Sequence, residues 1–154
     1  MKTDAKFYAS HSENDTRRLG YDLGRALKPG VVVLLCGDLG AGKTVFVRGV
    51  GEAFGVKGVR SPSFTIINEY ESPSGVYVIH ADLYRLDSEG VNAVGLDEYA
   101  GANDSVLFVE WPERWSNPPA DEVMTVRFEA VNENERRIII TAEGAKAEEA
   151  LRLI

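Results

Sequence analysis

The spacing of hydrophobic residues changes several times along the chain, and each spacing predicts a different element. Six uninterrupted apolar residues at positions 31–36 are typical of a strand buried on both faces, as in a parallel sheet. After a glycine-rich stretch, Phe46, Val50 and Ala53 recur at the spacing of one helix face, and the apolar pattern runs to Phe54. We therefore predict a strand, a tight loop and a helix in direct succession.

The segment before this unit predicts a short strand and then a helix. The strand is expected around residues 7–8. Ser12 followed by Asp15 is typical of a capping box, in which side chains satisfy the free N–H groups at the start of a helix. Apolar residues within positions 19–27 then share one face, and the Pro-Gly pair at 29–30 is expected to end the helix.

Further along, the chain alternates between strand and helix patterns. The expected elements are strands at 64–71 and 76–82, a short helix and loop at 87–104, a buried strand at 105–109, a hairpin of 124–130 with 137–142, and a terminal helix at 145–153. Because side chains alternate along a strand, His80 and Asp82 share one face at the end of the second of these strands.

The glycine-rich stretch has the pattern of a phosphate-binding loop, G-x-x-x-x-G-K-[ST]. It reads Gly37, Asp38, Leu39, Gly40, Ala41, Gly42, Lys43, Thr44. Its glycines let backbone N–H groups converge on an anion, and the helix behind it adds partial positive charge. Lys43, expected to face solvent, would reach the outer phosphates, and the Thr44 hydroxyl would bind Mg²⁺. An ordinary glycine turn also fits the letters, but the strand and helix lie where the motif needs them.

Acidic residues end two of the later strands. Asp82 and Glu110 each follow an apolar run, and ligands of open α/β sheets gather at the carboxyl ends of strands. An acid in that place beside a phosphate loop has the Walker B pattern, which holds Mg²⁺ directly or through water. We therefore expect both acids to join Lys43 in catalysis and Thr44 in metal binding. His80 is interpreted as structural, since a lone histidine usually is.

A hydroxyl-rich loop follows the predicted phosphate-loop helix. Pro62 stiffens it and restricts Ser61, so the hydroxyls of Ser61, Ser63 and Thr65 are held on a loop of limited freedom. Such a loop can contact the γ-phosphate, its Mg²⁺ or the attacking water, as switch loops do. A simple turn into the next strand fits equally well, and the residues leave both interpretations open.

Charge and composition narrow the class of protein. The 154 residues carry a net charge of −7, with a pI near 4.9 and one cysteine. We expect no disulfide or membrane segment, a cytoplasmic location, and Cys36 as a core residue. The arginine pairs at 17–18 and 136–137 are interpreted as solvated faces. A protein without a basic stripe binds nucleic acid poorly by itself, so a partner is expected to hold any nucleic acid.

Four short blocks together resemble one protein family. They are residues 37–44, Ser61-Pro62-Ser63-Phe64, His80-Ala81-Asp82-Leu83-Tyr84-Arg85-Leu86 and Glu110-Trp111-Pro112. Their order and spacing, over roughly residues 12–115, resemble the TsaE family of bacterial tRNA threonylcarbamoyladenosine formation. The resemblance implies a single α/β P-loop NTPase domain over residues 1–154, with a mixed, mostly parallel central sheet flanked by helices and a C-terminal antiparallel hairpin.

The resemblance also implies an activity and a set of partners. It implies an ATPase that uses Mg²⁺, is weak alone, and acts through a TsaD/TsaB-like complex that contacts the tRNA. The nucleotide-binding set then extends to Glu13, Val45 and Ser63, with the segment after Glu13 near the base and the loop from Ser61 acting as a switch. Ser63 and Val45 depart from the family, which usually has threonine at both positions.

Other functions compatible with a phosphate loop differ in their further sequence requirements. A GTPase needs an N-K-x-D tetrapeptide, which the sequence lacks. A small-molecule kinase usually carries an arginine-bearing lid, and no arginine-rich insertion separates the strands. A nucleotide-dependent protein-binding module without hydrolysis stays open as an alternative, and the kinase remains a weaker one.

Overall fold

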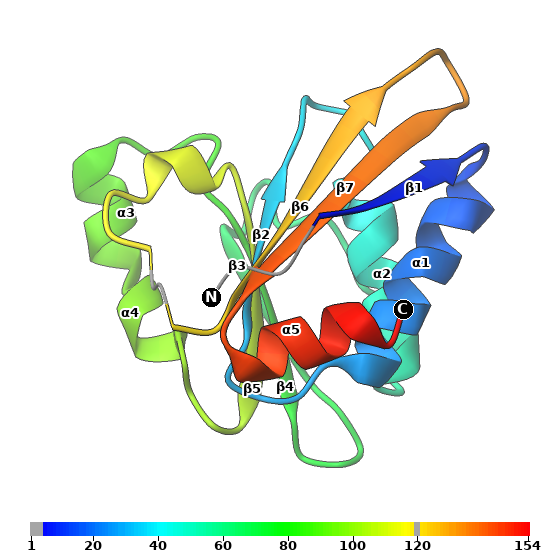
Figure 1. The fold of residues 1–154 in the computed structure, drawn as a ribbon. Coiled ribbons are helices and arrows are strands. Elements are labelled where there is room, and N and C mark those ends of the chain that lie inside the picture. The colour runs from blue at the N-terminus through cyan, green and yellow to red at the C-terminus, as the bar shows by residue number, and fades with distance from the viewer. Residues whose placement is uncertain (1–4, 119–120) are drawn as a thin grey trace.

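The computed structural model describes residues 5–118 and 121–154, which form a mixed sheet with helices on both faces (Figure 1). The strands are β1 (Lys6–Ser10), β2 (Val32–Cys36), β3 (Ile67–Glu71), β4 (Tyr77–Asp82), β5 (Ser105–Glu110), β6 (Val123–Ala130) and β7 (Arg136–Glu143). The helices are α1 (Glu13–Ala26), α2 (Lys43–Ala53), α3 (Ser88–Val94), α4 (Leu96–Tyr99) and α5 (Ala145–Arg152), with the 3₁₀ turn η1 at Pro112–Arg114.

The strand order places the phosphate loop at the centre of the sheet. Within the described part of the chain the order is β1-β7-β6-β2-β5-β4-β3. Strands β6, β2, β5 and β4 run parallel, and antiparallel pairs flank them at both edges. Because parallel strands end at the same edge, the loop after β2 lies beside the ends of β4 and β5. The α/β class and the mixed sheet are confirmed.

Two hydrophobic cores lie on opposite faces of the sheet. One core packs α1, α2 and α5 against residues such as Val33 and Leu35 of β2. The other packs α3 and α4 against Val32 of the same strand (Figure 1). The uninterrupted apolar run of this strand therefore supplies both cores in alternation, as expected of a strand covered on both sides.

Helices α1 and α2 approach each other backbone to backbone. A Cβ atom on Gly20 would collide with the carbonyl oxygen of Phe46, and one on Gly49 would collide with that of Arg17. Only glycine permits so close a contact, because any other residue carries a Cβ. The start of α1 is thereby fixed against the helix that follows the phosphate loop.

The structure corrects some expected boundaries. The strand expected from residue 64 begins only at Ile67, because Ile66 donates its N–H to the Pro62 carbonyl and closes a turn at 2.7 Å. The segment 87–104 holds two helices, separated at Gly95, which has a left-handed conformation with φ of 77°.

The predicted cap at the start of α1 is confirmed, since Ser12 Oγ accepts the Asp15 N–H at 3.1 Å. In the described residues, no helix is long and apolar enough to cross a membrane.

Candidate functional site

The phosphate loop has the backbone shape that anion binding needs. Gly40 and Gly42 adopt left-handed conformations with φ of 78° and 102°, which only glycine reaches without strain. Gly42 caps the start of α2, and no side chain among the described residues occupies the cap. The first N–H groups of α2 are therefore left for a ligand, and the helix dipole favours an anionic one.

Lys43 is buried, not solvent-facing as the sequence suggested. It is 4% exposed, and its Nζ donates to the Gly37 carbonyl at 2.7 Å. The same Nζ lies 3.9 Å from Glu110 Oε1 and 4.4 Å from the centre of the Trp111 ring. The ammonium group thus rests inside the loop, between a carbonyl, a carboxylate and an aromatic face, all of which favour its charge.

The two acids at the strand ends lie side by side. Asp82 and Glu110 are directly opposite in the β4–β5 register, and both are buried. Asp82 Oδ1 accepts the Tyr84 N–H at 2.9 Å, and its Oδ2 lies 3.5 Å from Ser63 Oγ. A cleft of about 260 Å³ is lined by both acids together with the predicted loop, switch and metal residues: Glu13, Leu39, Gly40, Gly42, Lys43, Thr44, Val45, Ser61 and Ser63.

The donor set of this cleft fits Mg²⁺. Among the described residues, no cluster of three or more His, Cys, Asp or Glu side chains could hold a metal by itself. Magnesium does not need one, because it keeps several waters and takes one or two carboxylates plus the phosphates of its nucleotide. Asp82 and Glu110 supply two carboxylates, and Thr44 adds a hydroxyl. The residues present therefore suit Mg²⁺ better than a metal ion that needs all of its ligands from the protein.

His80 contacts one of these acids. It is fully buried on β4, and its Nε2 lies 2.6 Å from Glu110 Oε2. Its Nδ1 has no hydrogen-bond partner among the described residues. The sequence placed His80 beside Asp82 on one face of the strand, but it gave no sign of the contact with Glu110, which comes from the neighbouring strand.

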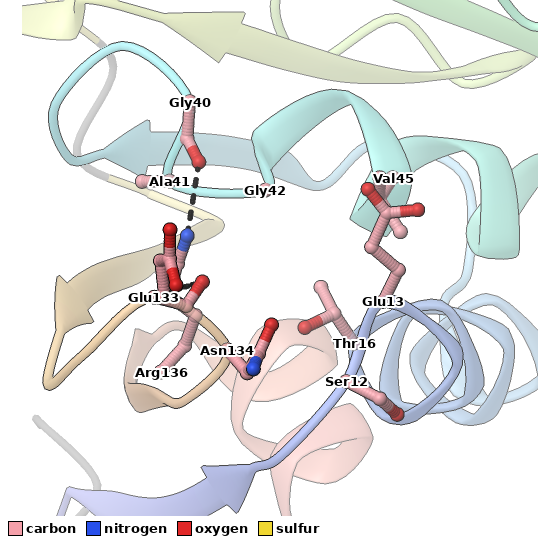
Figure 2. A pocket seen from close by; sticks show the side chains of 10 residues that line it. All are labelled: Ser12, Glu13, Thr16, Gly40, Ala41, Gly42, Val45, Glu133, Asn134 and Arg136. Carbon is pink, nitrogen blue, oxygen red and sulfur yellow. Dashed lines mark hydrogen bonds between the residues drawn. The ribbon is translucent and has the colours of Figure 1, made fainter.

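A second pocket, of about 250 Å³, lies between the phosphate loop and the start of α1 (Figure 2). Its lining residues come from α1 and its cap, the phosphate loop, the first turn of α2, and the β6–β7 turn with the start of β7: Ser12, Glu13, Thr16, Gly40, Ala41, Gly42, Val45, Glu133, Asn134 and Arg136. Glu13, Gly40, Gly42 and Val45 line both spaces, so the pocket and the cleft adjoin along the loop. A nucleotide with its phosphates in the cleft would have its base or ribose here.

Arg136 connects the β6–β7 turn to the phosphate loop. Its Nη2 donates to the Gly40 carbonyl at 3.3 Å, and its Nη1 donates to the Glu133 carbonyl at 3.3 Å (Figure 2). The same Nη1 also donates to the Asn132 carbonyl at 2.9 Å. Arg136 is half-exposed and Arg137 is exposed, so the pair does lie at the surface as expected, but Arg136 also contacts the phosphate loop. The sequence carries no local signal for this contact, because it arises only when β6 pairs with β2.

Gly37 and Asp38 lie at the far side of the loop. Together with Leu39 and Arg127 they line a shallower cleft that opens beside β6. The Asp38 side chain is exposed there, and its part in nucleotide binding stays a prediction.

The hydroxyl-rich loop is attached directly to Asp82. Ser61 Oγ and Ser63 Oγ lie 2.7 Å apart, and the Asp82 N–H donates to the Ile66 carbonyl at 2.8 Å. Ile66 is left-handed, with φ of 72°, which is strained for a β-branched residue. Phe64 is 86% exposed, with the Arg85 guanidinium 5.0 Å from its ring. The exposed Phe64 therefore lies within a short loop that is hydrogen-bonded to Asp82 at Ser63 and at Ile66.

Cys36 behaves as a packing residue at the end of β2. Burial raises the pKa of its thiol, and the nearby Arg127 guanidinium offsets this only in part. A thiol with a raised pKa carries little thiolate at neutral pH and is a poor nucleophile. The thiol therefore has no evident part in the chemistry of the cleft, although it is half-buried and not fully buried as expected.

Comparisons with known proteins extend beyond these motifs. Residues 10–138 match the family described as "Threonylcarbamoyl adenosine biosynthesis protein TsaE". The chain is 40% identical over 132 residues to "tRNA threonylcarbamoyladenosine biosynthesis protein TsaE" of Aquifex aeolicus (strain VF5), covering 84% of this chain and 90% of that one. It is 41% identical over 123 residues to the protein of the same name in Bacillus subtilis (strain 168), covering 79% and 75%. A crystal structure of Bacillus subtilis YdiB superimposes with a TM-score of 0.82 at 30% identity, covering 99% and 94%.

Proposed function

The chain belongs to the TsaE family, and we propose that it binds and hydrolyses ATP with Mg²⁺ to support threonylcarbamoyladenosine modification of tRNA. The observation that carries the proposal is the single cleft lined by Lys43, Thr44, Asp82 and Glu110. Phosphoryl transfer asks a protein mainly for positioning and electrostatic stabilisation, and these residue types supply both.

Charge explains why the nucleotide and the metal would bind together. Asp82 and Glu110 contribute two negative charges to the cleft and Lys43 one positive charge, which leaves the side chains net negative. A bare triphosphate meets repulsion from these buried carboxylates, where the low dielectric weakens screening. When bound, Mg²⁺ would neutralise the carboxylates and polarise the phosphate oxygens. We therefore expect tight nucleotide binding to require the divalent ion.

The chain's own residues have separate roles in this proposal. Lys43 exchanges its contact with the Gly37 carbonyl for the outer phosphates. Thr44 and Glu110 hold Mg²⁺, and Asp82 orients the metal or the attacking water. The amides of the loop bind the phosphate oxygens, while Glu13 and Arg136 bound the pocket for the base and ribose.

A protein partner would connect this chemistry to tRNA. The net charge of −7 supports an indirect contact, because many phosphates cannot be neutralised by an acidic protein. The partner expected from the family is a TsaD/TsaB-like complex. The loop from Ser61 offers a means of signalling to it, since Asp82 and the exposed Phe64 belong to one hydrogen-bonded segment.

The test separates nucleotide binding from hydrolysis. Glu110→Gln and Asp82→Asn keep the shape of each side chain and remove its charge. We expect at least one variant to bind ATP and to lose partner-stimulated hydrolysis by about 100-fold, equivalent to about 2.7 kcal/mol. ATPase rates are measured with and without TsaD/TsaB-like proteins and tRNA. Parental rates in both variants would contradict the catalytic assignment, and ATP binding without any hydrolysis by the parent would favour a binding module.

A further inference from the structure

His80 is a buried polar residue whose position in the core needs an explanation. Its neighbours Val78 and Ala81 on β4 and Phe108 on β5 are fully buried apolar residues. An apolar side chain would suit the same place without any polar atom to satisfy. Burying an imidazole costs free energy unless it is hydrogen-bonded, and Nδ1 has no partner among the described residues. Its one hydrogen bond, to Glu110, is therefore the interaction that offsets the burial.

The direction of that hydrogen bond follows from the chemistry of the acceptor. An ionised carboxylate can only accept, so Nε2 carries the proton and donates to Glu110 Oε2 at 2.6 Å. The contact holds one of the two carboxylate oxygens on the core side of the strand.

The other carboxylate oxygen of Glu110, Oε1, consequently faces the cleft. Oε1 lies 3.9 Å from Lys43 Nζ, too far for a hydrogen bond. Without His80, the carboxylate would be free to rotate and form a short, two-oxygen ion pair with that ammonium group. Such a pair would withdraw both Glu110 from a metal ion and Lys43 from a phosphate.

We propose that His80 is a positioning residue, whose Nε2–H holds Glu110 in the orientation that leaves Oε1 available to Mg²⁺. The inference deepens the proposed function, because it rests on Glu110 being a metal ligand there. Hydrogen bonds that orient metal ligands typically contribute 10- to 100-fold to metal affinity. His80 therefore sets the Mg²⁺ affinity without contacting the metal or the nucleotide.

Two variants with the same functional group test the role of the donor. His80→Gln places an amide N–H close to the position of Nε2, whereas His80→Asn carries the same amide one methylene shorter and stops near Nδ1. Ser105→Ala is the matched control. Ser105 is a buried residue at the opposite end of β5 from Glu110, and its hydroxyl also has no hydrogen-bond partner within the part of the chain that the structure describes.

The readout is metal binding and not turnover. Calorimetry gives the Kd for ADP in EDTA and at a series of Mg²⁺ concentrations, from which the apparent Mg²⁺ affinity follows. We expect His80→Asn to weaken Mg²⁺ binding 10- to 100-fold, with the Kd for ADP in EDTA within twofold of the parent. His80→Gln and Ser105→Ala should bind Mg²⁺ like the parent. If the role of His80 were purely structural, its substitution would change the melting temperature but would leave the difference between the Kd for ADP in EDTA and the Kd in Mg²⁺ as in the parent.

A double substitution shows whether His80 acts through Glu110. In a Glu110→Gln background, His80→Asn should cause no further loss of Mg²⁺ affinity. If Glu110→Gln itself leaves Mg²⁺ binding unchanged, the proposed metal site fails. If Glu110→Gln weakens it but His80→Asn does not, or if His80→Gln is as weak as His80→Asn, the role of His80 alone is overturned. Should His80→Asn not fold, His80→Leu, which suits a buried strand, replaces it in the same comparison.

Discussion

The close contact between α1 and α2 predicts that Gly49→Ala destabilises the protein, although the same substitution would stabilise an isolated helix. Alanine is favoured over glycine inside a helix by about 0.8–1.0 kcal/mol, so Gly49→Ala would stabilise an isolated α2. In the folded protein the new methyl group collides with the Arg17 carbonyl, a backbone atom that cannot rotate away. Overpacking typically costs about 1–3 kcal/mol, and a Cβ placed this close to a backbone oxygen belongs in the upper half of that range, about 2–3 kcal/mol.

We therefore expect Gly49→Ala to lower the free energy of unfolding by a net of about 1–2 kcal/mol. For a domain of this size the melting temperature should fall by about 2–8 °C. Urea unfolding followed by circular dichroism measures the change, with an unchanged m-value showing that the unfolding transition is the same. Displacement of α1 should also weaken nucleotide binding, because Glu13 and Thr16 line the pocket beside the loop.

Gly90→Ala is the matched control. Gly90 lies inside α3, and a Cβ there would meet only the side chains of Asp87 and Leu86, at 3.2 Å. Only a small shift of side-chain atoms relieves these contacts, although Asp87 Oδ1 is also held by the cap hydrogen bond that it accepts from the Gly90 N–H. This substitution should therefore change the stability by less than about 1 kcal/mol in either direction. A Gly49→Ala variant as stable as the Gly90→Ala variant would refute the backbone-to-backbone contact.

Further predictions concern the ligands and the thiol. Lys43→Ala should abolish tight Mg-ATP binding in calorimetry, and unchanged affinity would contradict the phosphate-loop assignment. Arg136→Ala should weaken ATP binding about tenfold and inorganic triphosphate binding by less, since Arg136 lines the pocket beyond the phosphates but also donates to the Gly40 carbonyl of the phosphate loop. In gel shifts the chain alone should bind tRNA only weakly at physiological salt, and tight, salt-sensitive binding would refute the partner-mediated reading. Because burial raises the pKa of Cys36, its alkylation rate should keep rising with pH beyond the point where the rate for a free cysteine levels off. A pH midpoint of alkylation at or below that of free cysteine would contradict the raised pKa.

The sequence predicted those parts of the site that depend on local order. The loop from Gly37 to Thr44 is encoded by its own glycines and by the strand and helix that flank it. Asp82 and Glu110 were found because each ends an apolar run, and parallel strands bring such ends together. The start of α1 at Ser12 was equally local, since a cap acts over three residues.

Features that depend on long-range pairing were not predictable. Arg136 reaches Gly40 only because β6 pairs with β2, and no local pattern specifies that register. The contact between His80 and Glu110 spans two strands, and neither residue alone indicates it. Lys43 was expected to face solvent because lysine usually does, but Gly37, Glu110 and Trp111 enclose its charge.

The position of β2 in the sheet has a consequence for biosynthesis. Its two neighbours, β5 and β6, both come later in the chain, and β6 begins at Val123. During translation, β2 therefore remains an unpaired, almost wholly apolar strand until most of the polypeptide has been made. Exposed strands of this kind are templates for aggregation. Nonsense or frameshift lesions between β5 and β6 should consequently yield products that misassemble or are degraded, even though every residue from Gly37 to Glu110 is intact.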